Sequence, residues 1–138
     1  VIDQGDDGQA IRMAIATLLM EVARAHSTTS EAERQAVQRL IETHFALPKD
    51  VSQTIAAAAE HEAERATSLY PLTSMINSEC SQQDKRQVVR MLWEVSFADG
   101  HLDRHEEHII RRIADLLHVP HREFIRAKLQ VTEEGPGR

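Results

Sequence analysis

The chain has 138 residues, with 22 acidic and 16 basic side chains and a net charge of −6. A single domain of this size can bury a hydrophobic core without metal or disulfide crosslinks. The acidic balance argues against binding to nucleic acid or to an anionic membrane, and it favours a cation or a basic partner. Cys80 is the single cysteine, which excludes a disulfide framework and a thiolate metal site and is typical of a reducing compartment.

Charged residues interrupt every apolar stretch before it reaches a membrane-spanning length, and no signal-peptide pattern is present. We therefore expect a cytoplasmic domain without direct membrane insertion. The chain begins with Val1 rather than methionine, so it can be a fragment of a longer protein. Glycine and proline are scarce and helix-forming residues dominate, which predicts an all-α fold with no sheet.

The first half of the chain predicts three helices. Residues 1–8 are polar and are expected to form a disordered N-terminal stretch. Apolar residues at helical spacing then predict helices over about residues 9–26, 30–44 and 49–69. Ser30 and Glu33 form the S-x-x-E pattern in which side chain and backbone cap each other at a helix start.

The second half predicts a short bridging helix and three more. Residues 70–83 connect the halves, with a helix over about residues 72–79. Helices follow over about residues 84–98 and 103–117 and from Pro120 to Val131, and residues 132–138 are expected to be a disordered tail. Trp93 is expected beside the apolar stripe of its helix, where its indole N–H needs an acceptor.

An internal repeat predicts how these helices are arranged. The segment from Trp93, WEVSFADGHLDRHEEHIIRRIADLLHV, returns in weaker form from Met20 as MEVARAHSTTSEAERQAVQRLIETHF. Neither helical hairpin can bury its apolar face alone. We therefore expect one domain over residues 9–131, a bundle of about seven helices from two pseudo-repeated units at about 9–69 and 84–131. The matching residues are Leu19, Glu21, Val22, Ala25, Glu33 and Arg39 in the first copy and Leu92, Glu94, Val95, Ala98, Glu106 and Arg112 in the second.

Two charged pairs recur in this repeat. Glu21 with Arg39 and Glu94 with Arg112 occupy matching positions of the two hairpins. We expect each pair to form a structural ion pair that crosses from one helix of its hairpin to the next.

The loop of the second copy is a candidate metal site. Asp99, Asp103 and Glu106 can converge on one cation, because Gly100 permits a sharp reversal of the chain. Such oxygen ligands suit Mg²⁺ or Ca²⁺, whereas nearby histidines would favour Zn²⁺ or another transition metal. The glycine follows the first aspartate directly, so the loop is not an EF-hand. Additional candidate ligands are Glu107 and the histidines His101, His105 and His108.

Helix capping is the competing interpretation of the same residues. Gly100 can end one helix in the left-handed conformation, and Asp103 with Glu106 can cap the next. The positive end of that helix dipole also disfavours a cation beside it. Capping leaves Asp99 without a role, however, so both interpretations stay open.

Catalytic motifs are absent from the sequence. The HEEH run places His105 and His108 three residues apart, whereas the zinc-protease signature needs a spacing of four. No Ser-His-Asp or Cys-His arrangement can be argued from the sequence. We expect a protein that is not an enzyme.

The second unit and the segment SLYPLTSMIN from Ser68 resemble the TerB-like helical domain, a bacterial family named for tellurite resistance and related to the N-terminal domain of a membrane-tethered DnaJ-type co-chaperone. The strongest likeness is A-D-G-x-L-D-x-x-E at residues 98–106, followed by IRRIADLL. The resemblance implies a seven-helix bundle, a divalent-cation site on Asp99, Asp103 and Glu106, and a link to stress or metalloid resistance. The first unit departs from this pattern, with His26 and Ser27 in place of Asp and Gly.

The leading hypothesis is a non-enzymatic cytoplasmic domain that binds Mg²⁺, Ca²⁺ or Zn²⁺ at the loop from Asp99 to Glu106. Its acidic helical surface is expected to meet a protein partner, with a homodimer as a second option. The alternative is a metal-free interaction module whose loop is only a capped turn. A metal-dependent hydrolase would need a pocket beside the carboxylates with an open coordination position.

Overall fold

The computed structural model describes residues 6–25, 30–100 and 102–134, and this part of the chain is all-helical. It contains no strand and confirms the predicted all-α fold of seven helices. The helices are α1 (Asp6–Ala23), α2 (Glu31–His44), α3 (Lys49–Arg65), α4 (Tyr70–Glu79), α5 (Gln82–Ser96), α6 (Arg104–Leu116) and α7 (His121–Glu134).

The outermost helices are longer than the sequence pattern predicts. Residues 6–8 belong to α1 and residues 132–134 belong to α7, although both stretches were expected to be disordered. At the C-terminal end, Val131 is buried and packs into the core, which holds the last turn of α7 in place. Residues 1–5 and 135–138 lie outside the described residues.

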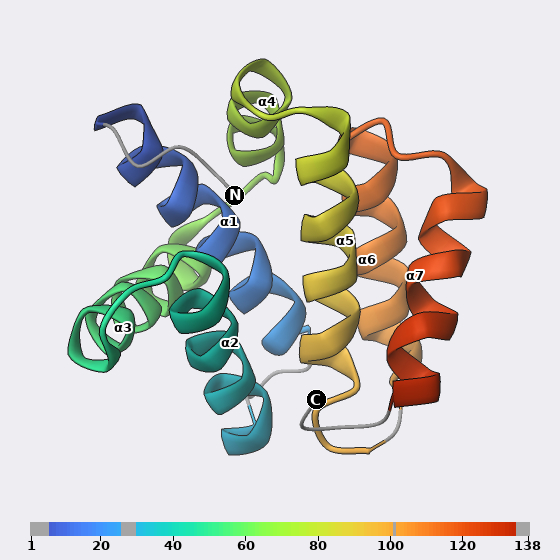
Figure 1. Ribbon diagram of the computed structural model, residues 1–138, viewed down its shortest axis with the longest axis horizontal. Coiled ribbons are helices and arrows are strands. Elements are labelled where there is room, and N and C mark those ends of the chain that lie inside the picture. Colours follow the sequence, from blue (N-terminus) through green and yellow to red (C-terminus); the bar gives the residue numbers. More distant parts are fainter. Residues whose placement is uncertain (1–5, 26–29, 101, 135–138) are drawn as a thin grey trace.

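The helices form two groups with α4 between them. Helix α1 packs on α2 and α3, as α5 packs on α6 and α7, and α1 and α5 contact each other where the groups meet (Figure 1). The internal repeat therefore corresponds to two units of three helices that close over one core.

The second helix of each unit ends in the same turn. Ala46 and His118 both have positive φ, 52° and 61°, although neither is a glycine. In each turn the next amide bonds back to the helix, Leu47 N to Glu42 O at 3.2 Å and Val119 N to Ala114 O. These are the bonds of a Schellman motif, which satisfies helix-end carbonyls that have no partner within the helix.

Equivalent residues of the two units share the core. Met20 is 1% exposed and its counterpart Trp93 is 0% exposed, and both belong to one hydrophobic cluster. The indole N–H of Trp93 donates to the carbonyl of Phe124 at 3.1 Å, and the two rings lie 5.0 Å apart. This contact supplies the acceptor that the sequence pattern required.

The predicted ion pairs across the hairpins are wrong. Among the described residues, neither Glu21 with Arg39 nor Glu94 with Arg112 forms an ion pair within 4.0 Å. Arg39 and Arg112 are exposed, whereas both glutamates are partly buried and burial raises their pKa. Glu94 pairs instead with Arg90 on its own helix, at 3.2 Å.

Other ion pairs join the helices within each unit. Arg34 on α2 forms a two-pronged pair with Glu60 on α3, at 3.0 and 2.8 Å. Glu107, at the matching position of α6, pairs with Lys128 on α7 at 3.3 Å. The charge at this position is reversed between the units, and in each unit the third helix provides the opposite charge.

Candidate functional site

The described residues between α5 and α6 include a left-handed glycine and a helix cap. Gly100 follows α5 with φ at 97°, the left-handed conformation that glycine adopts without steric cost. Asp103 is the N-cap of α6, and its Oδ1 accepts from the amides of His105 at 2.9 Å and Glu106 at 3.1 Å. Asp99, directly before Gly100, is exposed.

Glu106 points into the protein and not toward the solvent side of this loop. Its side chain is 2% exposed, and its Oε1 accepts from the hydroxyl of Ser96 at 2.9 Å. Ser96 is the last residue of α5, so this bond ties the end of one helix to the start of the next. The reciprocal cap expected of Glu106 on Asp103 is therefore replaced by a contact with the preceding helix.

Glu33, the counterpart of Glu106 in the first unit, faces it across the boundary between the units. Glu33 is 3% exposed, and its Oε1 accepts from the hydroxyl of Ser30 at 2.9 Å. Interaction with the Glu33 side chain raises the pKa of Glu106, which places the two carboxyl groups next to each other. We call these two residues the acid pair.

The environment of Glu106 favours the protonated form of its carboxyl group. The pKa of Glu106 is raised to about 9, mainly by burial and also by the hydrogen bond and charge of Glu33 and by the charge of Asp103. The bond from Ser96 partly opposes this shift. Two carboxyl groups can share a hydrogen bond only when one of them is protonated, so the raised pKa of Glu106 is consistent with close contact between the two groups.

The predicted metal ligands are only partly brought together. Asp103 is close enough for its charge to act on Glu106, but its Oδ1 already caps α6. Glu107 pairs with Lys128, and His105 and His108 are exposed. Among the described residues, no three His, Cys, Asp or Glu side chains gather closely enough to hold a metal ion. His101, and His26 in the first loop, lie outside the described residues.

Glu33 and Ser96 were not identified from the sequence as part of this site. A signal was present, because Glu33 lies four residues before Val37 and Glu106 four residues before Ile110, both of which are fully buried. Residues four apart share one helix face. An acidic residue in line with an apolar stripe, at the same place in both copies, indicates two carboxyls that point into a shared core.

The architecture defines a class of all-helical domains built from two pseudo-repeated units. A protein-family model described as "Tellurite resistance protein TerB" matches residues 12–129. The chain therefore belongs to the TerB family. Comparisons with curated proteins and with solved structures gave no match.

Within the described residues, every helix is too short or too polar to cross a membrane.

Proposed function

We propose that this TerB domain is a non-enzymatic module that binds a divalent cation at the acid pair and the adjoining loop, where Glu106, Asp103 and Asp99 supply carboxylates. The observation that supports it is the burial of two facing carboxyls beside a third acid, Asp103. The interior disfavours so much negative charge without a counter-ion. A cation can take the place of the shared proton.

The chemistry of the donors favours a hard ion. Carboxylates and the hydroxyl of Ser96 are oxygen ligands, which suit Mg²⁺ or Ca²⁺ better than Zn²⁺. Because Asp103 caps α6 and Asp99 is exposed, binding requires the loop to rearrange toward Glu106. His101 and Glu107 remain additional candidate ligands in this proposal.

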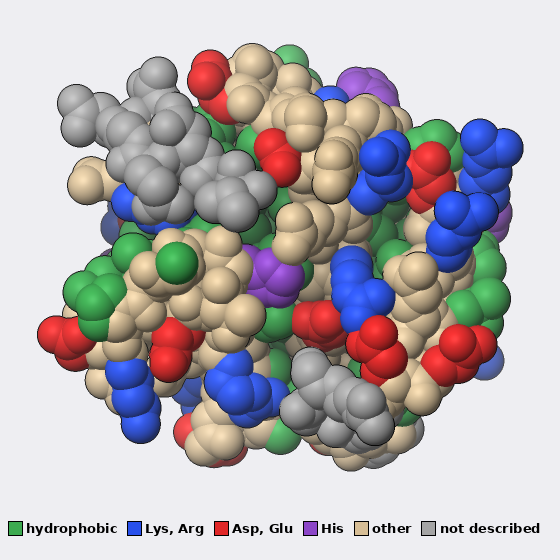
Figure 2. Space-filling model, viewed as in Figure 1, with side chains coloured by type: hydrophobic (Ala, Val, Ile, Leu, Met, Phe, Trp, Pro, Cys, Tyr) green, Lys and Arg blue, Asp and Glu red, His purple; other side chains and the backbone are tan. Residues whose placement is uncertain are grey.

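The wider role is part of the same proposal. A cytoplasmic location, a protein partner and a function in stress or metalloid resistance are consistent with the family description and the single cysteine. On one face of the molecule, acidic and basic side chains are interspersed over α5 and α7 (Figure 2). A partner on this face would need mixed charge, whether it is another protein or a second copy of the chain.

The second candidate is a metal-free interaction module, and a specific observation favours it. The Oδ1 of Asp103 already accepts two amide bonds at the start of α6, so this oxygen has a structural role without any metal. In that case the acid pair is a structural contact that fixes how the two units meet, as buried polar groups do in some other proteins.

Calorimetric titration with Ca²⁺, Mg²⁺ and Zn²⁺ separates these candidates. Two substitutions remove the loop carboxylates: Asp99→Ala, and Asp103→Ser, which keeps a helix cap like Ser30. Cation binding predicts heat for the wild type and for Asp115→Asn, an exposed acid on α6, and none for the double variant Asp99→Ala with Asp103→Ser. Absence of heat in all three proteins leaves the metal-free module.

A further inference from the structure

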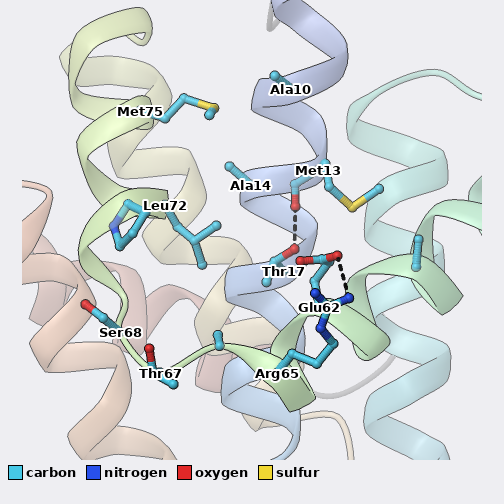
Figure 3. Close-up of a pocket in the computed structure, with 13 residues that line it drawn as sticks. Ala10, Met13, Ala14, Thr17, Glu62, Arg65, Thr67, Ser68, Leu72 and Met75 are labelled. Atoms are coloured by element: carbon cyan, nitrogen blue, oxygen red, sulfur yellow. Dashed lines mark hydrogen bonds and ion pairs between the residues drawn. The ribbon is translucent and has the colours of Figure 1, made fainter.

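The groove between α1, α3 and α4 has no excess of charge. Its lining includes one cation, Arg65, and one anion, Glu62. Figure 3 shows the guanidinium of Arg65 turned onto the carboxylate of Glu62, and the two groups lie 3.9 Å apart. The charged side chains on the outside of α6 are arranged differently.

The exposed side of α6 carries an excess of positive charge. Residues four and seven positions apart lie on one side of a helix, and six side chains of α6 that follow this spacing are exposed. We call them the outer face of α6: Arg104, His105, His108, Arg111, Arg112 and Asp115. This face holds three arginines and one aspartate, in a chain whose net charge is −6.

The arginines of this face form no ion pair with the described part of the protein. No carboxylate of the described residues lies within 4.0 Å of Arg104, Arg111 or Arg112. Glu107, at the edge of the face, pairs with Lys128 on α7. The three guanidiniums are therefore available to an external anion, and each can donate two parallel hydrogen bonds to one carboxylate.

The first unit shows that the fold does not require these arginines. The matching helix α2 also begins with an N-cap and ends in the same left-handed turn. Its residues at the corresponding positions include one arginine and two glutamates, and they are Glu31, Ala32, Gln35, Gln38, Arg39 and Glu42. A structural role common to both helices therefore does not explain the charge of the outer face of α6.

We propose that the outer face of α6 binds an acidic segment of a partner protein, with glutamate or aspartate side chains on Arg104, Arg111 and Arg112. Arg104 and Arg111 are seven residues apart, which corresponds to about 10 Å along the helix, and three or four extended residues span about this distance. The proposal rests on the proposed function only in that it gives the chemistry of the protein partner. The loop carboxylates and the acid pair take no part in it.

A short acidic segment fits this face better than a nucleic acid or an anionic membrane does. Proteins that bind DNA make roughly 6–10 phosphate contacts, whereas this face offers three arginines. The net charge of −6 opposes a large polyanion that extends beyond the face. Because exposed charges at physiological ionic strength act over only about 8 Å, a short segment interacts mainly with the arginines.

Hexaglutamate is the probe for the test, and hexaglutamine is the matched peptide without charge. An NMR titration of the backbone amides, with no divalent cation present, measures the affinity and locates the site. We expect hexaglutamate to bind with its largest shifts on α6, and hexaglutamine to bind more weakly by roughly tenfold or more. Added NaCl should weaken the binding of hexaglutamate, since the contacts are exposed ion pairs.

Two double variants with the same change in net charge test the location. Arg104→Glu with Arg111→Gln gives α6 the residues that α2 has at the matching positions, and it should weaken hexaglutamate by roughly tenfold or more. Arg39→Glu with Lys49→Gln makes the same change at exposed residues of the first unit and should leave the affinity nearly unchanged. Circular dichroism confirms that both variants fold.

Four results would overturn the proposal. They are no binding of hexaglutamate, equal binding of hexaglutamine, equal losses of affinity in the two double variants, and tighter binding of a DNA duplex or of phosphatidylserine vesicles to the same face. The variants keep Asp99, Asp103 and Glu106, and the titrations contain no divalent cation. A failure here therefore leaves the calorimetric test of cation binding unaffected.

Discussion

The two units keep the same framework but differ in the chemistry of their loops. Both place an N-cap, a buried glutamate and a left-handed turn at matching positions of their second helix. In the first unit Glu33 bonds to its own cap, Ser30, whereas in the second unit Glu106 bonds to Ser96 on the preceding helix. The residue that matches Ser96 is Ala23, which has no hydroxyl to offer.

This difference shows which features the fold requires. Core positions, helix caps and helix ends recur because each unit depends on the other to bury its apolar face. Carboxylates occur in the loop of the second unit only, where Asp99 and Asp103 stand at the positions of His26 and Ser30 in the first unit. The acid pair takes one residue from each unit and links the shared framework to the loop that differs.

The largest expected effect tests whether both units share one core. Trp93→Ala should lower the free energy of unfolding by about 4 kcal/mol, and Met20→Ala by about 3 kcal/mol, since both side chains are fully buried. Urea denaturation measures both values. A loss of less than about 1 kcal/mol for Met20→Ala would contradict a common core.

The next prediction concerns the pH dependence of the acid pair. The folded-state pKa of Glu106 is about 9, against 4.5 for the ordinary group, so the folded state holds the proton more tightly. This contribution to stability is complete below pH 4.5 and is lost as the pH rises through about 9. Burial raises the pKa of Glu21 and Glu94 in the same direction, so the contribution of Glu106 must be isolated by a variant.

Glu106→Gln is that variant, because its amide mimics a protonated carboxyl. Without added cation, it should stabilise the protein at pH 8 by on the order of 2 kcal/mol and flatten the pH dependence, as measured by thermal or urea unfolding. Glu107→Gln, at the adjacent position, is the control and should not flatten it. Equal pH profiles for wild type and Glu106→Gln would show that the pair does not hold the proton.

The loss of stability on removing a helix cap should be similar in the two units. Ser30→Ala and Asp103→Ala should each cost about 1 kcal/mol, because each removes an acceptor for amides at a helix start. Asp103→Ser should recover most of the loss in the second unit. If it recovers none, the role of Asp103 is not that of a cap.

The smallest effects are expected for the ion pairs. A double-mutant cycle on Arg34 and Glu60 should give a coupling of about 0.5–1 kcal/mol, since the pair is two-pronged and partly exposed. The hydrogen bond from Arg34 lowers the pKa of Glu60, so this coupling should fade in acid. The cycle for Glu94 and Arg112 should give no coupling, and a value above about 0.5 kcal/mol there would contradict the structure.

Much of the fold could be predicted because the sequence patterns are local. Apolar spacing, the serine at residue 30, Gly100 and the repeat depend on contacts within one helix or one turn. The prediction of ion pairs across the hairpins failed because a recurring spacing does not decide which side of a helix a side chain faces. Arg39 is adjacent to buried Leu40 in sequence but lies about 100° away around the helix, in solvent.

The candidate site was predicted only in part for a related reason. The sequence places Asp99, Asp103 and Glu106 near one loop, and the spacing from Glu106 to Ile110 indicates only that this carboxyl lies on the buried face of its helix. The contact with Glu33 joins residues from different units, and its formation depends on how the two units pack. Only the structure supplies that information.

The central claim is that Glu33 and Glu106 meet in the interior and share a proton. The most direct test is an NMR titration of the Glu106 side-chain carboxyl carbon in the wild type and in Glu33→Ala, with no added cation. We predict a titration near pH 9 in the wild type and a clearly lower value in the variant, because the hydrogen bond and charge of Glu33 are lost. Titration near pH 4.5 in both proteins would contradict the account.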